Sequence, residues 1–154
     1  MLVALFTALF CGPAFARDAG SGIGAGLILS GPTGFSGKYW MGGKNAVDGA
    51  MTWSSGSNNG LNGGGYLYLH ADYLIHKFGL IKVKKGRLPV YYGLGAKLWL
   101  VNNAGAGARV PFGLSYIFAG YPLDIFLELV PGLNIVPNVD FDMDGAFGVR
   151  YYFK

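Results

Sequence analysis

Residues 90–100 read VYYGLGAKLWL and alternate between bulky apolar side chains and side chains that are small or charged. A period of two indicates a β-strand, because successive side chains of an extended backbone point to opposite sides. The segment therefore predicts a strand with one large apolar face and one nearly bare face. The apolar face would carry Val90, Tyr92, Leu94, Ala96, Leu98 and Leu100, and the other face Gly93, Gly95 and Lys97.

The same alternation recurs along the rest of the chain, and no segment carries the 3.6-residue apolar stripe of a helix. We expect an all-β fold, an eight-stranded antiparallel up-and-down transmembrane β-barrel with strands of about ten residues. The other strands would centre on residues 23–29, 35–41, 47–53, 66–76, 109–118, 123–130 and 146–153. Short turns are expected at 31–34, 42–45, 84–86, 102–105 and 120–122, and longer connections at Ser54–Gly65 and Pro131–Gly145.

The composition excludes several classes of protein. Glycine occupies 27 of 154 positions, while charged residues make up 13% of the chain and aromatic residues 16%. A disordered chain is richer in charge, and a coiled coil needs charged heptads, whereas Glu128 is the only glutamate. A net charge of +4 is too sparse to indicate a nucleic-acid partner. The length fits a single domain.

The first sixteen residues are expected to lie outside the fold. Leu2–Phe10 is a short apolar run, and Ala14-Phe15-Ala16 follows it, which is the pattern of a secretory signal peptide cleaved after Ala16. Residues 17–154 would then form the barrel domain. Cys11, the only cysteine, lies in the removed segment, so the mature chain would hold no disulfide or thiolate metal site. Lipidation of Cys11 is disfavoured by the bulky Phe10 before it.

The two strand faces differ in a way that bears on the solvent around the protein. One face is apolar and aromatic, and the other combines Gly, Ala and Ser with isolated charges. The polar face is too poor in charge for a solvated exterior, but it suits the narrow interior of eight strands. The apolar face would then point outward into lipid. The alternative is a soluble, lipocalin-like periplasmic barrel whose apolar faces line a cavity for a small apolar ligand.

Tyrosines provide a second indication of a membrane. With the N-terminus in the periplasm, one tyrosine on each of five strands would face outward near the periplasmic end, as an interfacial aromatic girdle requires. The connections Ser54–Gly65, Asn102–Gly107 and Pro131–Gly145 would then lie outside the cell, and the short turns Gly42–Asn45, Lys84–Gly86 and Gly120–Pro122 in the periplasm. The girdle residues are Tyr39, Tyr73, Tyr92, Tyr116 and Tyr151.

The C-terminal segment resembles the signal that outer-membrane barrels present to their assembly machinery. Gly148 is followed three residues later by Tyr151 and five residues later by Phe153. Ala146, where a polar residue is usual, and Lys154 after the phenylalanine depart from the pattern. Together with the eight alternating segments, this sequence resembles the small OmpA-like outer-membrane barrels. The resemblance implies export to the bacterial outer membrane, with outer-membrane lipid and the barrel assembly machinery as partners, and a monomeric barrel whose lumen is plugged by side chains.

Charged residues on the bare face are expected to pair with one another in the lumen. An unpaired charge there would be costly, so we interpret the set as structural, with a gated ion path as the functional alternative. We expect Arg109 and Arg150 to bridge Glu128. The complete set is Lys38, Asp48, His70, Asp72, Lys97, Arg109, Glu128 and Arg150.

Three weaker patterns have functional alternatives. His70 and Asp72 with Ser115 permit the hypothesis of a lipid-modifying hydrolase, although Ser115 lacks the nucleophile-elbow motif. Asp140, Asp142 and Asp144 match half of a calcium loop, whose twelfth position is occupied by Tyr151 instead of glutamate. The basic run Lys77–Arg87 would meet anionic lipid headgroups or an acidic envelope partner, or would simply be a solvated hairpin tip, which we favour.

The function expected from the sequence is therefore non-catalytic and needs no cofactor. The chain would serve as an integral outer-membrane barrel with a structural role in the envelope or a surface-interaction role for its outer loops. The lipocalin-like binding protein is the main alternative, and an outer-membrane lipid-modifying enzyme is the third.

Overall fold

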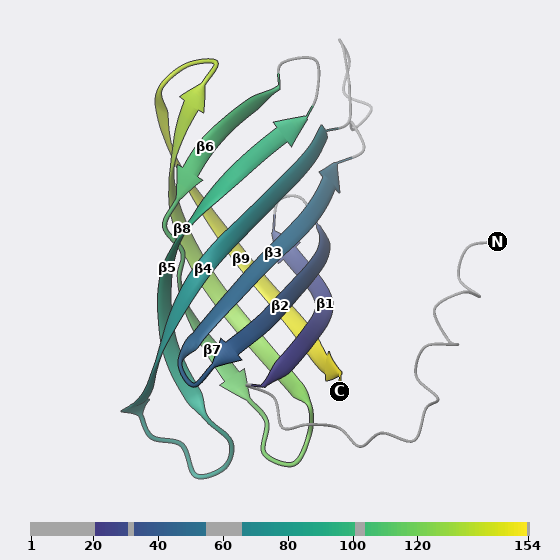
Figure 1. The fold of residues 1–154 in the computed structure, drawn as a ribbon, viewed down its shortest axis with the longest axis vertical. Coiled ribbons are helices and arrows are strands. Elements are labelled where there is room, and N and C mark those ends of the chain that lie inside the picture. The colour runs from purple at the N-terminus through teal and green to yellow at the C-terminus, as the bar shows by residue number, and fades with distance from the viewer. Residues whose placement is uncertain (1–20, 31–32, 55–65, 101–103, 154) are drawn as a thin grey trace, which may run out of the picture.

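The computed structural model describes residues 21–30, 33–54, 66–100 and 104–153, and this part of the chain is all-β. Nine antiparallel strands form one sheet (Figure 1). The predicted signal peptide and most of the predicted connection Ser54–Gly65 lie outside the described residues. The strands are β1 Gly22–Ser30, β2 Gly34–Gly42, β3 Asn45–Ser54, β4 Tyr66–Ile81, β5 Leu88–Leu100, β6 Gly105–Arg109, β7 Phe112–Ile117, β8 Leu123–Val136 and β9 Asp140–Phe153.

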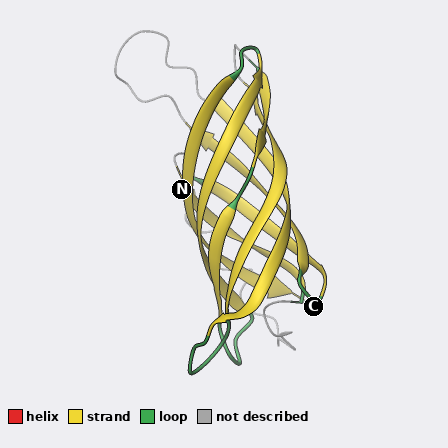
Figure 2. Ribbon diagram, turned by 90° about the vertical axis from the view of Figure 1, so that its left-hand side faces the viewer, coloured by secondary structure: helices red, strands yellow, loops and turns green. Residues whose placement is uncertain are grey.

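The hydrogen bonds of the sheet form a closed ring. From β1 to β5, and from β8 to β9, consecutive strands pair with each other, and β6 and β7 each pair with β5 and β8. β1 also pairs with β9, from Ile23↔Phe153 to Ser30↔Ala146. Closure leaves no long unpaired strand edge, and the sheet is tubular when seen from two directions (Figures 1 and 2). Within the described residues, no helix has the length and apolarity to cross a bilayer.

The ring has two ends, a proximal end and a distal end. The proximal end holds the start of β1, the end of β9 and the β2–β3, β4–β5 and β7–β8 turns, and it lies at the bottom of Figure 1. The distal end holds the β8–β9 turn, the last residues of β1, β3 and β5, and the first residues of β2, β4 and β6.

The sequence predicted one strand over residues 109–118, whereas the structure divides residues 105–117 into β6 and β7. Both segments pair with β5 and with β8 in unbroken register, because Arg109 faces Gly95 and Phe112 faces Tyr92. Pro111 lies at the break, where its missing N–H cannot join the ladder. The nine strands thus occupy eight positions around the ring.

A row of paired residues shows how far the ring is staggered. Followed from strand to strand, the row leaves β9 at Tyr152 and returns to β9 at Asp142, ten residues away. With about 3.3 Å per residue and about 4.8 Å between strands, this stagger tilts the strands by about 40° and gives a radius of about 8 Å. The row is Tyr152, Gly24, Lys38, Asp48, Asp72, Gly95, Arg109, Gly132 and Asp142.

The predicted division of strand faces agrees with the exposure of the side chains. Most of the large apolar residues of the described strands point away from the ring, and eight charged residues are buried inside it. Leu94 and Leu129 are 64% and 63% exposed, whereas Arg150 is 1% exposed. Other outward residues include Leu27, Phe35, Met51, Leu98, Phe112, Leu127, Phe147 and Val149.

The long connection predicted at Pro131–Gly145 is wrong. β8 continues to Val136 and β9 begins at Asp140, with Pro131 paired to Met143 and Leu133 paired to Phe141. The apolar residues Leu133, Ile135 and Phe141 continue the outward alternation through this hairpin. Pro131 and the Asp-rich run indicate a turn by residue type, but the strand tolerates both because the period of two is unbroken.

Glycines on the inner face make room for the large side chains that fill the ring. A Cβ at Gly95 would overlap the carboxylate of Asp72 and the backbone carbonyl of Ala71. A Cβ at Gly132 would overlap Asp142 and the ammonium group of Lys97. The bare face of the sequence pattern is therefore a set of spaces occupied by side chains from neighbouring strands.

We predict that Gly95→Ala lowers the free energy of unfolding by about 1–3 kcal/mol, because the added methyl group overpacks the interior. The measurement is urea unfolding followed by tryptophan fluorescence. Gly37→Ala is the matched control, since its nearest neighbour would be the carbonyl of Gly24 at 3.8 Å. Equal stabilities for the two variants would contradict the packing assigned to Gly95.

Candidate functional site: the buried ion-pair network

Most of the charges predicted for the lumen are buried inside the ring. Arg150, Arg109, Lys38 and Lys97 are at most 3% exposed, and Asp48, Asp72, Asp124 and Glu128 are equally enclosed. Several of these residues lie on the row described above, so the stagger carries the charges from one end of the ring toward the other. The network is built on strands, whose backbones hold its geometry.

Arg150 organises the proximal half of the network. From β9 its Nη2 donates to Asp48 Oδ2 on β3 at 2.8 Å, and its Nε donates to Ser36 on β2 at 3.0 Å. Its Nη1 lies 4.0 Å from Asp124 Oδ2 on β8. The guanidinium also lies 3.8 Å from the ring centroid of Phe126. One side chain thus connects four strands through charge and stacking.

Arg109 organises the distal half. Its Nη2 donates to Glu128 Oε1 at 3.2 Å, and its Nε lies 3.0 Å from Asp72 Oδ2. Tyr91 donates to the second oxygen of Glu128 at 2.8 Å. The predicted contact between Arg109 and Glu128 is therefore present.

Arg150 pairs with other carboxylates instead of the predicted Glu128. Arg150 directs its ion pairs to Asp48 and Asp124, which lie nearer the proximal end. The reason is the stagger: Arg150 pairs across the sheet with Asp124, whereas Glu128 faces Ala146 on the same strand pair.

The two buried lysines have separate partners. Lys38 Nζ donates to His76 Nε2 at 2.7 Å and lies 4.5 Å from the Trp40 ring centroid. His76 Nδ1 in turn donates to the carbonyl of Lys44 at 3.1 Å, which is consistent with a neutral imidazole. Lys97 pairs with Asp142.

Sequence reasoning left several members out of the network. Asp124 accepts from Tyr152 at 2.7 Å and from Ser115 at 3.2 Å, and His76 and Tyr91 take part through Lys38 and Glu128. All of them are fully buried at inward positions of the strand alternation. The period-two alternation was therefore the signal in the sequence that could have identified them.

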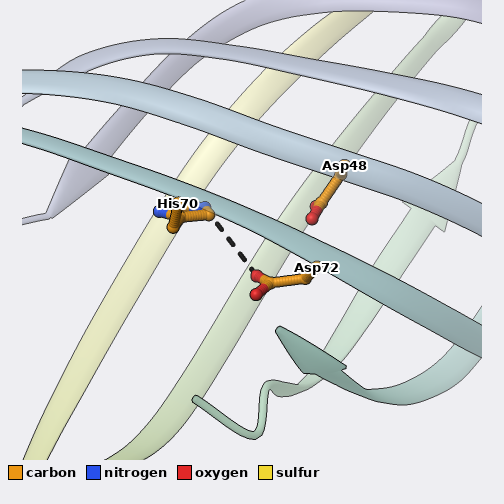
Figure 3. Close-up of side chains that lie close together, drawn as sticks. All are labelled: Asp48, His70 and Asp72. Atoms are coloured by element: carbon orange, nitrogen blue, oxygen red, sulfur yellow. Dashed lines mark ion pairs between the residues drawn. The ribbon is translucent and has the colours of Figure 1, made fainter. Parts of the chain in front are cut away.

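Asp48, His70 and Asp72 are residue types that can bind a metal ion, and they lie close together. One ligand atom from each lies within 4.8 Å of the others (Figure 3), because Asp48 and Asp72 are paired across β3 and β4. The guanidinium groups of Arg150 and Arg109 already lie against the two carboxylates. Because these arginines already provide positive charge beside the carboxylates, we assign the three residues to the ion-pair network.

The described contacts do not assemble the hydrolase arrangement of His70, Asp72 and Ser115. His70 Nε2 lies 3.8 Å from Asp72 Oδ2, beyond hydrogen-bond distance. Ser115 donates to Asp124, and its predicted base is on β4, which is not a neighbour of β7 in the ring. A nucleophile needs its base within reach.

The half calcium loop is part of a strand. Asp140, Asp142 and Asp144 occupy alternate positions at the start of β9, and Asp142 pairs with Lys97. An extended backbone spaces such residues by about 6.6 Å, so they do not wrap around one ion as a calcium loop does. The loop geometry proposed from the sequence is wrong because the hairpin is longer than predicted.

Toward the distal end, a cavity of about 180 Å³ borders the network. Its lining is polar and aromatic and includes Tyr68, His70, Trp99, Arg109 and Asn134. The described interior thus combines a filled proximal half with a small polar space near the distal end. The bulky apolar strand faces, which would line the cavity of the lipocalin-like alternative, point outward instead.

The five predicted girdle tyrosines all lie on the outward face. Tyr39, Tyr73 and Tyr92 are 52%, 42% and 38% exposed, and Tyr116 and Tyr151 are partly exposed. Four lie within four residues of the proximal end of their strands. Tyr73 lies further in because β4 continues to Ile81, past its last pairing with β3 at Ile75.

No protein-family model, curated protein or solved structure matches this chain. The class of molecule is therefore defined by its geometry alone: a closed all-β sheet with an ion-paired interior and an apolar exterior.

We predict that Asp48→Asn lowers the free energy of unfolding by about 3 kcal/mol, because it leaves the buried guanidinium of Arg150 short of its main partner. A double-mutant cycle with Arg150→Met, measured by urea unfolding, should give a coupling energy of about 1–3 kcal/mol. Asp144→Asn, at an exposed position, is the control and should change stability little. Additive single effects would contradict the assigned ion pair.

Proposed function

We propose that this protein is a transmembrane β-barrel of a bacterial outer membrane, with a non-catalytic role in envelope structure or surface interaction. The observation that carries the proposal is the inverted distribution of side chains. Bulky apolar residues cover the outside of the ring and paired charges fill its inside. Water penalises an apolar exterior of this extent, whereas lipid accommodates it.

The dimensions of the ring support the same proposal. Strands tilted by about 40° match the 35–45° of outer-membrane barrels. At about 2.5 Å of axial rise per residue, nine-residue β1 reaches about 22 Å, and the longer strands reach 30 Å or more. The apolar band of such barrels is about 25 Å tall.

The distribution of aromatic residues is consistent with one orientation. The outward tyrosines near the proximal end would form an interfacial belt. With the N-terminus in the periplasm, this end would face the periplasm and the distal connections would lie outside the cell. Tyr151 and Phe153, with Gly148, would serve as the signal read by the assembly machinery. Their outward rings lie 5.2 Å apart at the end of the ring-closing strand β9.

The filled interior favours a structural role over transport. In the described residues, ion pairs and the packed side chains of Trp40, Ile117 and Tyr152 occupy the proximal half. An eight-position ring has room for little besides side chains. We therefore assign no solute path, and we place any interaction with a partner at the outer connections.

The deciding experiment is expression of the chain with its leader, isolation of outer membranes and SDS electrophoresis with and without boiling. We expect a membrane-fraction band that migrates differently after boiling, because a closed hydrogen-bonded ring resists detergent until it is heated. A band in the soluble periplasmic fraction with no shift would overturn the proposal and favour the soluble, lipocalin-like alternative.

A further inference from the structure

The exposed charges of the described residues are divided between the two ends of the ring. Six cations lie at the proximal end, and two carboxylates at the start of β9, Asp140 and Asp144, lie at the distal end. Among the described residues the proximal end has no exposed carboxylate, because its one acidic residue, Asp124, is fully buried. The proximal cations are Lys44, Lys77, Lys82, Lys84, Lys85 and Arg87.

Most of these cations belong to the β4–β5 hairpin, which reaches further than the other proximal turns (Figure 1). The hairpin also exposes apolar side chains: Leu80 is 68% exposed and Ile81 is 40% exposed. These two residues directly precede Lys82 and follow Lys77 by three and four positions. Solvation of the lysines alone does not account for the exposed apolar side chains between them.

We propose that this hairpin binds anionic phospholipid headgroups in the leaflet around the proximal end. The inference rests on the proposed membrane insertion. Leu80 and Ile81 enter the boundary between headgroups and acyl chains, and the lysines reach the phosphates along their flexible stems. Clustered lysines beside a membrane attract anionic lipid, and each one adds to the attraction.

A lipid explains the surface better than an acidic protein does. An acidic protein would account for the lysines, but not for isolated aliphatic side chains that flank them next to the tyrosine belt. The belt supplies continuity, because Tyr73 and Tyr92 lie on the same two strands as the hairpin. From Tyr73 the chain passes Lys77 and then Leu80 and Ile81, and the turn that follows β4 carries Lys82, Lys84 and Lys85. Most of the lysines thus lie farther from the belt than the aliphatic residues, as expected at a lipid surface.

The test is native mass spectrometry of the full chain reconstituted in nanodiscs that contain equal amounts of phosphatidylglycerol and phosphatidylcholine. We expect the released protein to retain phosphatidylglycerol in preference. The triple substitution Lys82→Gln, Lys84→Gln and Lys85→Gln should reduce that preference by roughly fivefold or more. The matched control is Lys82→Arg, Lys84→Arg and Lys85→Arg, which keeps the charge and should keep the preference.

Two outcomes would overturn the inference. The first is equal retention of both lipids by the unsubstituted chain. The second is a preference that survives the glutamine substitutions. Binding of soluble polyglutamate to the hairpin without lipid preference would identify an acidic polypeptide as its partner instead.

The same samples separate this inference from the proposed function. A band that shifts on boiling, combined with no lipid preference, would reject the headgroup site alone. Failure to enter nanodiscs at all would reject both.

Discussion

Every charge inside the ring must find a partner there, and this requirement shapes the rest of the molecule. A buried guanidinium without a carboxylate would cost several kcal/mol, so Arg150 and Arg109 each gather acidic groups from other strands. Long side chains that cross the interior need space, which inner-face glycines such as Gly95 and Gly132 provide. The low content of charged residues and the high content of glycine therefore both follow from the packing of the interior.

The exterior follows from the interior. Once polar groups have turned inward, the alternation of each strand places Leu, Phe, Val and Tyr on the outside. Closure of the sheet by β1 and β9 satisfies the backbone hydrogen bonds that lipid would otherwise leave unpaired. Among the described residues, the remaining exposed charges lie at the two ends, cations at one and carboxylates at the other. In the proposed membrane setting, this segregation gives the molecule a direction across the bilayer.

The sequence predicted the faces well because they depend only on a period of two. Leu94 outward and Lys97 inward required no knowledge of neighbouring strands. Two kinds of information were missing. Pro111 breaks the ladder but not the register, and Pro131 sits within a strand, so proline marked a boundary in one case and nothing in the other. The partners of Arg150 depend on the stagger between strands, which no single strand encodes. For this reason the members of the network were largely predictable, whereas its pairings were not.

The ten-residue offset of the ring also limits how such a chain can change in length. Inserting one residue into any strand would turn all the side chains beyond it from lipid to interior, exposing charges and burying leucines. Such an insertion would also misalign the rows on both neighbouring strands. The connections at the ends carry no such condition. Variation in length is thus confined to the loops, and the strands tolerate insertions only where a bulge absorbs the extra residue, as between Lys77 and Ile81 beside the basic hairpin.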